Sequence, residues 1–299
     1  MASSLRRPRL ACALALATLA LGSGVFAAEP QPVAQRIVSL NPSLTAILVS
    51  IGAAGSIVGV DDYSAGKISQ VARLPRVGGL FSPSLEAVVS LRPDAVVLVP
   101  SAEQRDFRAR LDELGVRVIA FENLRFDQVL ANIRDLGALA GRGARAAERI
   151  EAITEARESA RRRAKGRARP GVLIVLQRDP IYVVGGGNFI QEMLNDLGAI
   201  NLAAEYGDAY PRVAAEWVVA QAPEVLIDLS PGEADPQAHW SRWPSIPAVA
   251  RGRVVALDAQ LISMPGPNLD QALEALERGL YVGVVPGADA DLAAAGREP

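Results

Sequence analysis

The chain has 299 residues, of which 50% are apolar and 21% are charged, and its formal net charge is −2. This mildly acidic balance gives no support for binding to nucleic acid or to an anionic membrane surface, and the composition is that of a globular protein. The only cysteine is Cys12, which lies in a segment that we expect to be removed, so the remaining chain has no disulfide.

The first 27 residues have the pattern of a secretory signal peptide. Three arginines among the first nine residues precede an apolar run at 10–21, and a cleavage signal follows at 25–27. We expect ordinary Sec export to the periplasm. Pro8 interrupts the twin-arginine pattern, and too little apolar sequence precedes Cys12 for lipidation. No later segment of the sequence is long and apolar enough to cross a bilayer.

Residues 33–142 are predicted to form an N-terminal α/β lobe. Asn41 occupies a helix N-cap and Pro42 the first helical position, and both residue types are favoured at these places. Strands that alternate with helices indicate a mostly parallel sheet. In chain order we expect strand 36–40, helix 42–52, strand 57–60, a helix opening at Ser82-Pro83, strand 94–99, helix 103–114, strand 116–121 and helix 126–140.

Residues 143–168 are predicted to be a connecting helix. The segment has no aromatic residue, is rich in Ala, Arg and Glu, and spaces its apolar residues near the helical period. A helix of some 22 residues would be about 33 Å long, which is enough to run from one lobe to another. A flexible tether would favour Gly, Ser and Pro instead. We therefore expect a stiff connector and little relative motion of the lobes.

Residues 169–283 are predicted to form a C-terminal α/β lobe, followed by a flexible tail at 284–299. The expected elements are strands 172–176, 181–184, 225–229 and 254–257 and helices 189–197, 216–221 and 269–281. The predicted fold class is therefore α/β, with two lobes that each contain a mostly parallel sheet with flanking helices, joined by one long helix.

Two stretches of the chain, 130 positions apart, are nearly the same. Glu86 and Glu216 each begin an apolar run, a proline follows seven residues later, and an acid and a β-rich segment come next. This repetition indicates two similar lobes with a cleft between them, where small-molecule sites are most often found. Each glutamate falls in a first helical turn, where it complements the dipole by about 0.3–1 kcal/mol. Alternatively, the two acids could meet basic residues of a partner that spans both lobes.

The sequence gives little support for an enzyme. His239 is the only histidine, so a metal site built from several histidines cannot form, and a Ser-His-Asp triad would have to use this one residue. The glycines at 185–187 lack the spacing of a dinucleotide loop and indicate a tight strand-to-helix turn. Trp240 and Trp243 are expected to pack under a loop. We expect no catalytic residue, no metal site and no cofactor.

Four motifs in order resemble one known family. They are Arg-Ile-Val-Ser-Leu-Asn-Pro-Ser-Leu-Thr at 36–45, Val-Gly-Val-Asp-Asp-Tyr-Ser at 58–64, the stretch from Val77 to Asp94, and Val-Val-Gly-Gly-Gly-Asn-Phe-Ile at 183–190. They resemble the periplasmic cobalamin- and siderophore-binding proteins of ABC importers, which have a single helical backbone between their lobes. The resemblance runs from about residue 35 to 281.

The resemblance implies roles for six residues. Glu86 and Glu216 match glutamates that engage arginines of the membrane permease. Tyr63 matches a tyrosine that contacts cobalamin, and Tyr210 falls where the cobalamin-binding relative has a pocket tryptophan. Phe81 lies beside the position of another pocket tryptophan, and Tyr182 lies near a pocket phenylalanine.

The sequence also departs from that relative. Leu80 and Val99 replace two of its pocket tryptophans, and Gln260 and Met264 replace an Asp and an Arg. The implied ligand residues are therefore Tyr63, Phe81, Tyr182 and Tyr210. Aromatic faces of this kind can cover a flat macrocycle while their hydroxyls hold its polar rim.

The resemblance implies a monomeric solute-binding protein that captures a corrinoid in the cleft and delivers it to an ABC permease in the inner membrane. The alternatives within the family are a ferric siderophore, then haem. A site for bare zinc or manganese would use several histidines. From other classes, a secreted α/β hydrolase that uses cleft carboxylates and a sensor subunit that passes its ligand-bound state to a receptor stay open.

Overall fold

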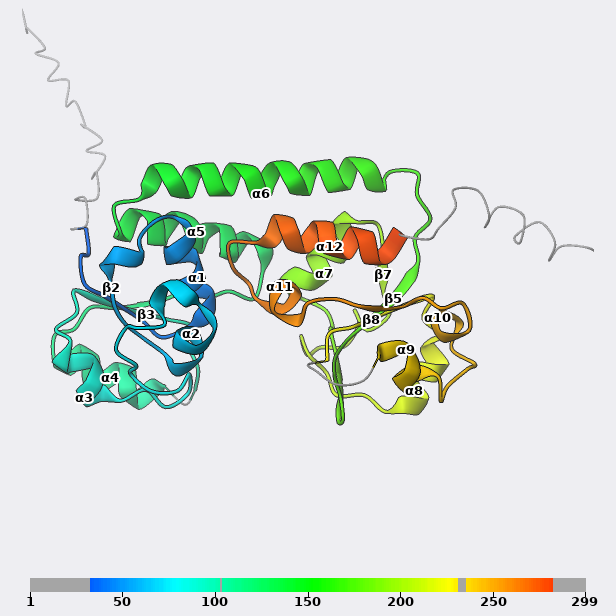
Figure 1. The fold of residues 1–299 in the computed structure, drawn as a ribbon, viewed down its shortest axis with the longest axis horizontal. Helices are drawn as coiled ribbons and strands as arrows, with labels where there is room; N and C mark the ends of the chain where they lie inside the picture. Colours follow the sequence, from blue (N-terminus) through cyan, green and yellow to red (C-terminus); the bar gives the residue numbers. More distant parts are fainter. Residues whose placement is uncertain (1–32, 103, 231–234, 282–299) are drawn as a thin grey trace, which may run out of the picture. The chain divides into compact units, whose positions relative to one another are not determined.

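The computed structural model describes residues 33–102, 104–230 and 235–281, and the proposed signal peptide and C-terminal tail lie outside them. Two sheets are each flanked by helices, and the long helix α6 (Gly143–Ala164) runs along one side of both (Figure 1). We call the part of the chain before α6 the first lobe and the part after it the second lobe. The predicted α/β fold with two lobes is confirmed.

The first sheet is parallel throughout, with strand order β2-β1-β3-β4. Its strands are β1 (Ile37–Ser39), β2 (Ile57–Val60), β3 (Ala95–Leu98) and β4 (Val118–Ala120). Its helices are α1 (Pro42–Ser50), α2 (Asp62–Lys67), α3 (Leu85–Ser90), α4 (Arg105–Glu113) and α5 (Phe126–Leu139). The side chains of β1 and β3 are buried on both faces, as expected for a parallel sheet covered by helices.

Helix α1 begins as predicted, whereas α3 does not. The Asn41 side chain accepts a hydrogen bond from the Ser43 N–H, and Pro42 is the first helical residue. Helix α3 begins at Leu85 with Ser84 as its N-cap, not at Ser82-Pro83. Pro83 instead pairs with Gly78 in an antiparallel bridge, so the chain is still extended where the sequence predicted a helix.

The second sheet has strand order β6-β5-β8-β9, with β7 also paired to β5, and only β6 is antiparallel. Its strands are β5 (Gly171–Arg178), β6 (Ile181–Val183), β7 (Ile200–Asn201), β8 (Val225–Asp228) and β9 (Val254–Ala256). Its helices are α7 (Phe189–Asp196), α8 (Ala215–Gln221), α9 (Pro236–Trp240), α10 (Pro247–Ala250), α11 (Ala259–Ser263) and α12 (Leu269–Tyr281). The sequence analysis missed α2, α9, α10, α11 and β7, which have six residues or fewer.

The repeat in the sequence is also a repeat in the structure. Arg92 and Ala222 both have positive φ angles, +46° and +47°, although neither is glycine. Each directly precedes the proline of its repeat. The left-handed conformation ends α3 and α8 and turns the chain into β3 and β8. The two lobes therefore use the same strained turn at the same place.

The acids of the repeat also have the same neighbours. The backbone N–H groups of Asp94 and Glu224 donate 2.8 Å hydrogen bonds to the Arg36 and Gly171 carbonyls, which stand at the start of β1 and β5. The Asp94 carboxylate accepts from the N–H groups of Gln35 and Arg36, and the Glu224 carboxylate accepts from the Gly171 N–H. Each acid therefore joins the beginnings of two adjacent strands in its sheet.

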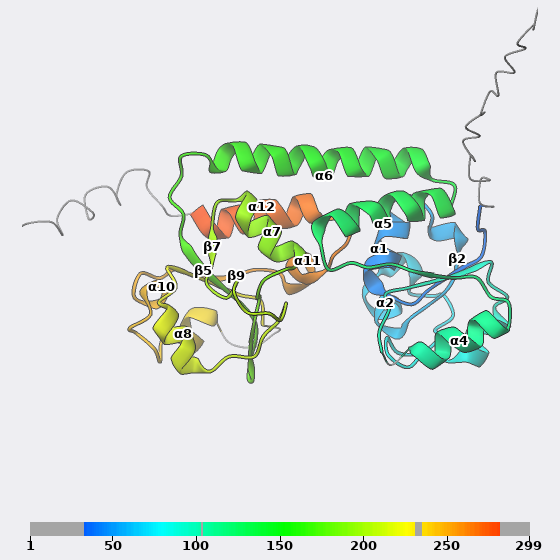
Figure 2. The ribbon, with the colours of Figure 1, turned by 180° about the vertical axis from the view of Figure 1, so that it is seen from behind.

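Helix α6 spans the predicted 22 residues and packs on both lobes. It buries Ala146, Ile153 and Ala160 and contacts α5 of the first lobe and α7 and α12 of the second (Figures 1 and 2). Gly137 of α5 allows a close approach, because a Cβ there would lie 2.4 Å from that of Ala146. One continuous apolar core therefore runs beneath α6 from lobe to lobe.

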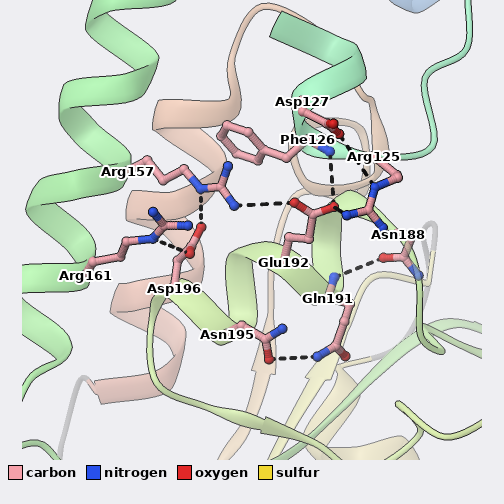
Figure 3. Close-up of polar contacts among 10 residues, drawn as sticks. All are labelled: Arg125, Phe126, Asp127, Arg157, Arg161, Asn188, Gln191, Glu192, Asn195 and Asp196. Carbon is pink, nitrogen blue, oxygen red and sulfur yellow. Dashed lines mark hydrogen bonds and ion pairs between the residues drawn. The ribbon is translucent and has the colours of Figure 1, made fainter.

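A cluster of charges adds to this packing (Figure 3). The Arg157 Nε lies 2.5 Å from Asp196 Oδ2 of α7, and its guanidinium lies 3.9 Å above the Phe126 ring of α5. Arg161 donates to the other oxygen of the Asp196 carboxylate at 2.6 Å. The Phe189 N–H of α7 also donates to the Leu124 carbonyl at 2.8 Å. The Phe189–Leu124 hydrogen bond joins the lobes directly, and the two arginines join the connecting helix to both lobes.

Candidate functional site

A hollow of about 590 Å³ lies between the two lobes. Its size is within the range of small-molecule sites. From the first lobe it is lined by Asn41, Pro42, Ser43, Tyr63, Lys67, Leu80 and Asn123, and from the second by Ala259, Gln260, Ser263, Met264 and Pro265.

The position of the hollow follows from the topology of the sheets. Asn41 follows β1, Asn123 follows β4, and α11 follows β9, so the lining comes from the segments after the carboxyl ends of parallel strands. This edge is where open α/β sheets bind ligands, because the loops that leave it can vary without disturbing the strands. The predicted cleft therefore has a physical counterpart in this hollow.

Hydrogen bonds order the floor of the hollow in the first lobe. The Asn123 amide donates to the Ser43 Oγ at 3.1 Å, and the Ser43 hydroxyl donates to Asn41 Oδ1 at 2.6 Å. Asn41 is at the same time the N-cap of α1. The sequence analysis gave Asn41 only this capping role and missed Asn123. Its place after a strand was the signal that could have identified it.

A buried polar network holds α2 against the sheet. The Asp61 carboxylate, which is fully buried, accepts hydrogen bonds from the N–H and the hydroxyl of Ser64. The Ser64 hydroxyl lies 3.2 Å from Thr45 Oγ1, which donates to Ser39 Oγ at 2.8 Å. Because these groups join α2, α1 and β1, the two α2 side chains in the lining have a fixed base.

Those two side chains are Tyr63 and Lys67. Tyr63 was predicted to contact the ligand; it is 49% exposed and lines the hollow. Lys67 was missed. The composition could have drawn attention to it, because only two of the chain's 31 basic residues are lysines.

The other three predicted aromatic residues lie elsewhere. Phe81 is 62% exposed and follows Leu80, whose carbonyl accepts a 2.5 Å hydrogen bond from the buried Gln104 side chain. Tyr182 is 36% exposed on β6. Tyr210 is half-buried against the main core, and this burial raises the pKa of its hydroxyl. The described lining of the hollow includes Leu80, Gln260 and Met264 and none of these three aromatic residues.

The comparison with known proteins identifies the family. Residues 37–261, most of the chain, match the family model described as periplasmic binding protein. This chain is a periplasmic binding protein. The family consists of substrate-binding proteins.

Three similar proteins indicate the range of the family. An uncharacterised ABC transporter substrate-binding lipoprotein of Bacillus subtilis is 28% identical over 257 residues, covering 83% of this chain and 80% of the relative. A vitamin B12-binding protein of Vibrio cholerae is 25% identical over 248 residues, covering 83% and 89%. The solved apo structure of a periplasmic haem-binding protein from Roseiflexus sp. RS-1 matches with a TM-score of 0.68 and 26% identity, covering 83% of this chain and 98% of the other.

The two glutamates of the repeat are exposed in this periplasmic binding protein. Glu86 and Glu216 lie in the first turns of α3 and α8, as the sequence predicted. Both helices lie at the edge of their lobe that is away from α6 (Figure 1). Neither carboxylate lines the hollow described above.

Residues near β8 that could suggest chemistry have structural roles. His239 packs on Trp240 and Trp243, with ring centroids 5.3 and 6.1 Å away. Burial, with the nearby Arg178 and Arg242 charges, lowers the pKa of His239. Trp240 is fully buried and donates from Nε1 to Asp228 Oδ2 at 2.7 Å, as expected for a packing residue. Within the described ranges, no group of three or more His, Cys, Asp or Glu side chains could hold a metal ion.

The glycines at 185–187 form a tight turn before α7. A Cβ on Gly185 would lie 2.3 Å from the Asp208 carbonyl oxygen, and one on Gly186 would lie 2.2 Å from that of Ala204. The Asn188 side chain closes the turn by donating to the Gly185 and Ala209 carbonyls.

Across the described residues, no helix combines the length and the apolar character that a membrane span requires.

Proposed function

We propose that this periplasmic binding protein captures a corrinoid between its lobes and delivers it to an ABC permease. The observation that carries the proposal is the hollow between the carboxyl edge of the first sheet and α11. It combines an aromatic side chain, apolar walls and convergent amide and hydroxyl groups, the lining that organic ligands require. The vitamin B12-binding relative supports a corrinoid. The pattern of residues 1–27 supports export to the periplasm by a cleaved signal peptide.

Haem or a ferric chelate is the second candidate, favoured by the haem-binding structure of similar identity. A flat porphyrin could lie against Tyr63 in the same way as a corrin ring. The chain needs no resident cofactor for either task, since the metal arrives with the ligand. We also propose that Phe81, Tyr182 and Tyr210 belong to a wider contact surface for the bound macrocycle.

A hydrolase has less support. It would need an acid or base with a shifted pKa beside the cleft. The described lining of the hollow contains no carboxylate and no histidine.

Ligand titration tests the proposal. The mature protein is titrated with cyanocobalamin, haemin and ferric citrate, and binding is followed by calorimetry and by tryptophan fluorescence. We expect one of the three probes to bind tightly and Tyr63→Ala to weaken it by about tenfold, the effect of removing one stacked aromatic contact. Absence of binding by all three would overturn it, and turnover of ester or glycoside substrates would then favour the hydrolase.

We further propose that Glu86 and Glu216 dock the protein, as a monomer, on the permease. Exposed charges at the rim of an interface mainly affect encounter rate and orientation. The double variant Glu86→Ala/Glu216→Ala should keep its ligand affinity and lose import, and its difference from the parent should become smaller at raised salt, because salt also screens the parent's two carboxylates. Glu158→Ala on the exposed face of α6 is the matched control and should import normally. Reduced ligand affinity in the double variant would contradict docking by these acids.

A further inference from the structure

We propose that Lys67 recognises an anionic oxygen group on the bound ligand, so that the ligand class is a metal macrocycle or chelate that carries a carboxylate or a phosphodiester. This inference rests on the proposed function and specifies its ligand.

The charge of the lining carries the argument. Of the twelve residues that line the hollow, Lys67 is the only one with a full charge at neutral pH. The others contribute amide, hydroxyl and apolar groups. Among the described residues, no carboxylate lies within ion-pair distance of the Lys67 ammonium group. The hollow therefore presents a net positive charge to its occupant.

Complementing the dipole of α2 is the simplest alternative role for Lys67. A cation in the last turn of a helix interacts favourably with the helix dipole, and Lys67 is the last residue of α2. That role explains a lysine at the end of the helix. It does not require the side chain to line an inter-lobe hollow, because a cation at the end of α2 would complement the dipole equally well if it pointed into solvent.

The support beneath Lys67 indicates a positioned group. Helix α2 is held to α1 and β1 by the buried hydrogen bonds of Asp61, Ser64 and Thr45. Tyr63 lies one turn before Lys67 on the same helix and lines the same hollow. A ring that stacks against Tyr63 would therefore bring its rim to the ammonium group. Tyr63 would select a flat face and Lys67 a negative edge.

Charge also affects how fast a ligand arrives. A cation at a concave site with low-dielectric walls raises the local concentration of anionic ligands, and salt weakens the effect. A carboxylate that pairs with an ammonium forms a charge-assisted hydrogen bond, which is stronger than a neutral one. Both effects favour anionic over neutral forms of the same macrocycle.

The test compares anionic and uncharged probes in the mature protein and in two variants. Haemin supplies carboxylates, cyanocobalamin supplies a phosphodiester, and dicyanocobinamide has the corrin ring without the phosphodiester. Lys67→Gln removes the charge and keeps a polar side chain. Lys165→Gln is the matched control, because it removes the only other lysine, at the end of α6 and outside the described lining of the hollow.

We expect Lys67→Gln to weaken the tightest anionic probe by about tenfold or more and to abolish most of its salt dependence. Dicyanocobinamide should bind both proteins equally, and Lys165→Gln should bind every probe as the parent does. Sensitivity of haemin alone identifies a carboxylate as the group, and sensitivity of cyanocobalamin alone identifies the phosphodiester.

Equal affinity of the parent and Lys67→Gln for a tightly bound probe would overturn the role of Lys67 and leave the proposed function standing. Tighter binding of dicyanocobinamide than of either anionic probe would do the same. If no probe binds the parent protein, the proposed function fails, and the inference fails with it. Thermal unfolding of each variant, measured beside the titrations, separates a lost contact from a lost fold.

Discussion

The two lobes share one frame, the order of their parallel strands, and differ in the segments that follow those strands. Strands β2-β1-β3-β4 of the first lobe and β7-β5-β8-β9 of the second have the same parallel order. After the strands, the first lobe places Lys67 and an ordered set of amide and hydroxyl groups in the hollow, whereas the second contributes α11. The comparison shows that packing maintains the repeated frame, while the loops at the strand ends are free to specialise.

Buried carboxylates also have different roles in the two lobes. The fully buried carboxylate of the first lobe, Asp61, is bonded to a serine beneath the ligand-side helix α2. In the second lobe, the buried carboxylate of Asp228 ends β8 and accepts hydrogen bonds from Trp240 and, at 2.9 Å, from Arg178. One acid supports the candidate site and the other joins a strand end to the α9 segment.

The largest expected effect concerns a turn that only the second lobe has. Gly186→Ala would place a Cβ 2.2 Å from a backbone carbonyl oxygen, which cannot move without disturbing the loop at 204–208. We expect the free energy of unfolding to fall by about 3 kcal/mol, measured in urea. Gly207→Ala, where no atom lies within 4 Å of the added Cβ, is the control and should be within about 0.5 kcal/mol of the parent. A Gly186 variant as stable as this control would show that the turn is not tight.

Substitution of the two acids of the repeat, Asp94 and Glu224, tests how similar the strand arrangements of the two lobes are. Asp94→Ala removes the acceptor of two backbone N–H groups, and Glu224→Ala removes the acceptor of one. We expect losses of about 2 and about 1 kcal/mol in the free energy of unfolding, because hydrogen bonds to charged groups contribute on this scale. Chemical denaturation of both variants measures the difference. A larger loss for Glu224→Ala would contradict the assigned roles.

The smallest effect concerns the strained turns that both lobes share. Arg92→Gly and Ala222→Gly should each stabilise the protein by up to about 1 kcal/mol, since glycine adopts a positive φ angle without the Cβ clash. The gain is reduced by the greater entropy of glycine in the unfolded chain. Melting temperatures and urea midpoints measure the effect, and Leu91→Gly, at a right-handed position, should destabilise. If one of the two variants is stabilised and the other is destabilised, the two turns are not structurally equivalent.

The sequence itself determined the frame, for local reasons. Asn41-Pro42 begins a helix, and the glycines at 52 and 198 end helices at positive φ. The alternation of apolar runs with helical periods predicts two mostly parallel sheets. The connecting helix was also readable, because the 22 residues from Gly143 have no residue that would interrupt it. Its apolar positions at 146, 153 and 160 became its buried face.

Only the tertiary structure decided which side chains meet at the hollow. Asn41, Lys67, Asn123 and Gln260 are up to 219 positions apart, and no periodicity relates them. Likewise, Ser82-Pro83 reads locally as a helix start, but pairing with Gly78 keeps it extended and moves the start to Leu85. Local propensities amount to tenths of a kcal/mol per residue, so packing and pairing between distant segments decide wherever the two disagree.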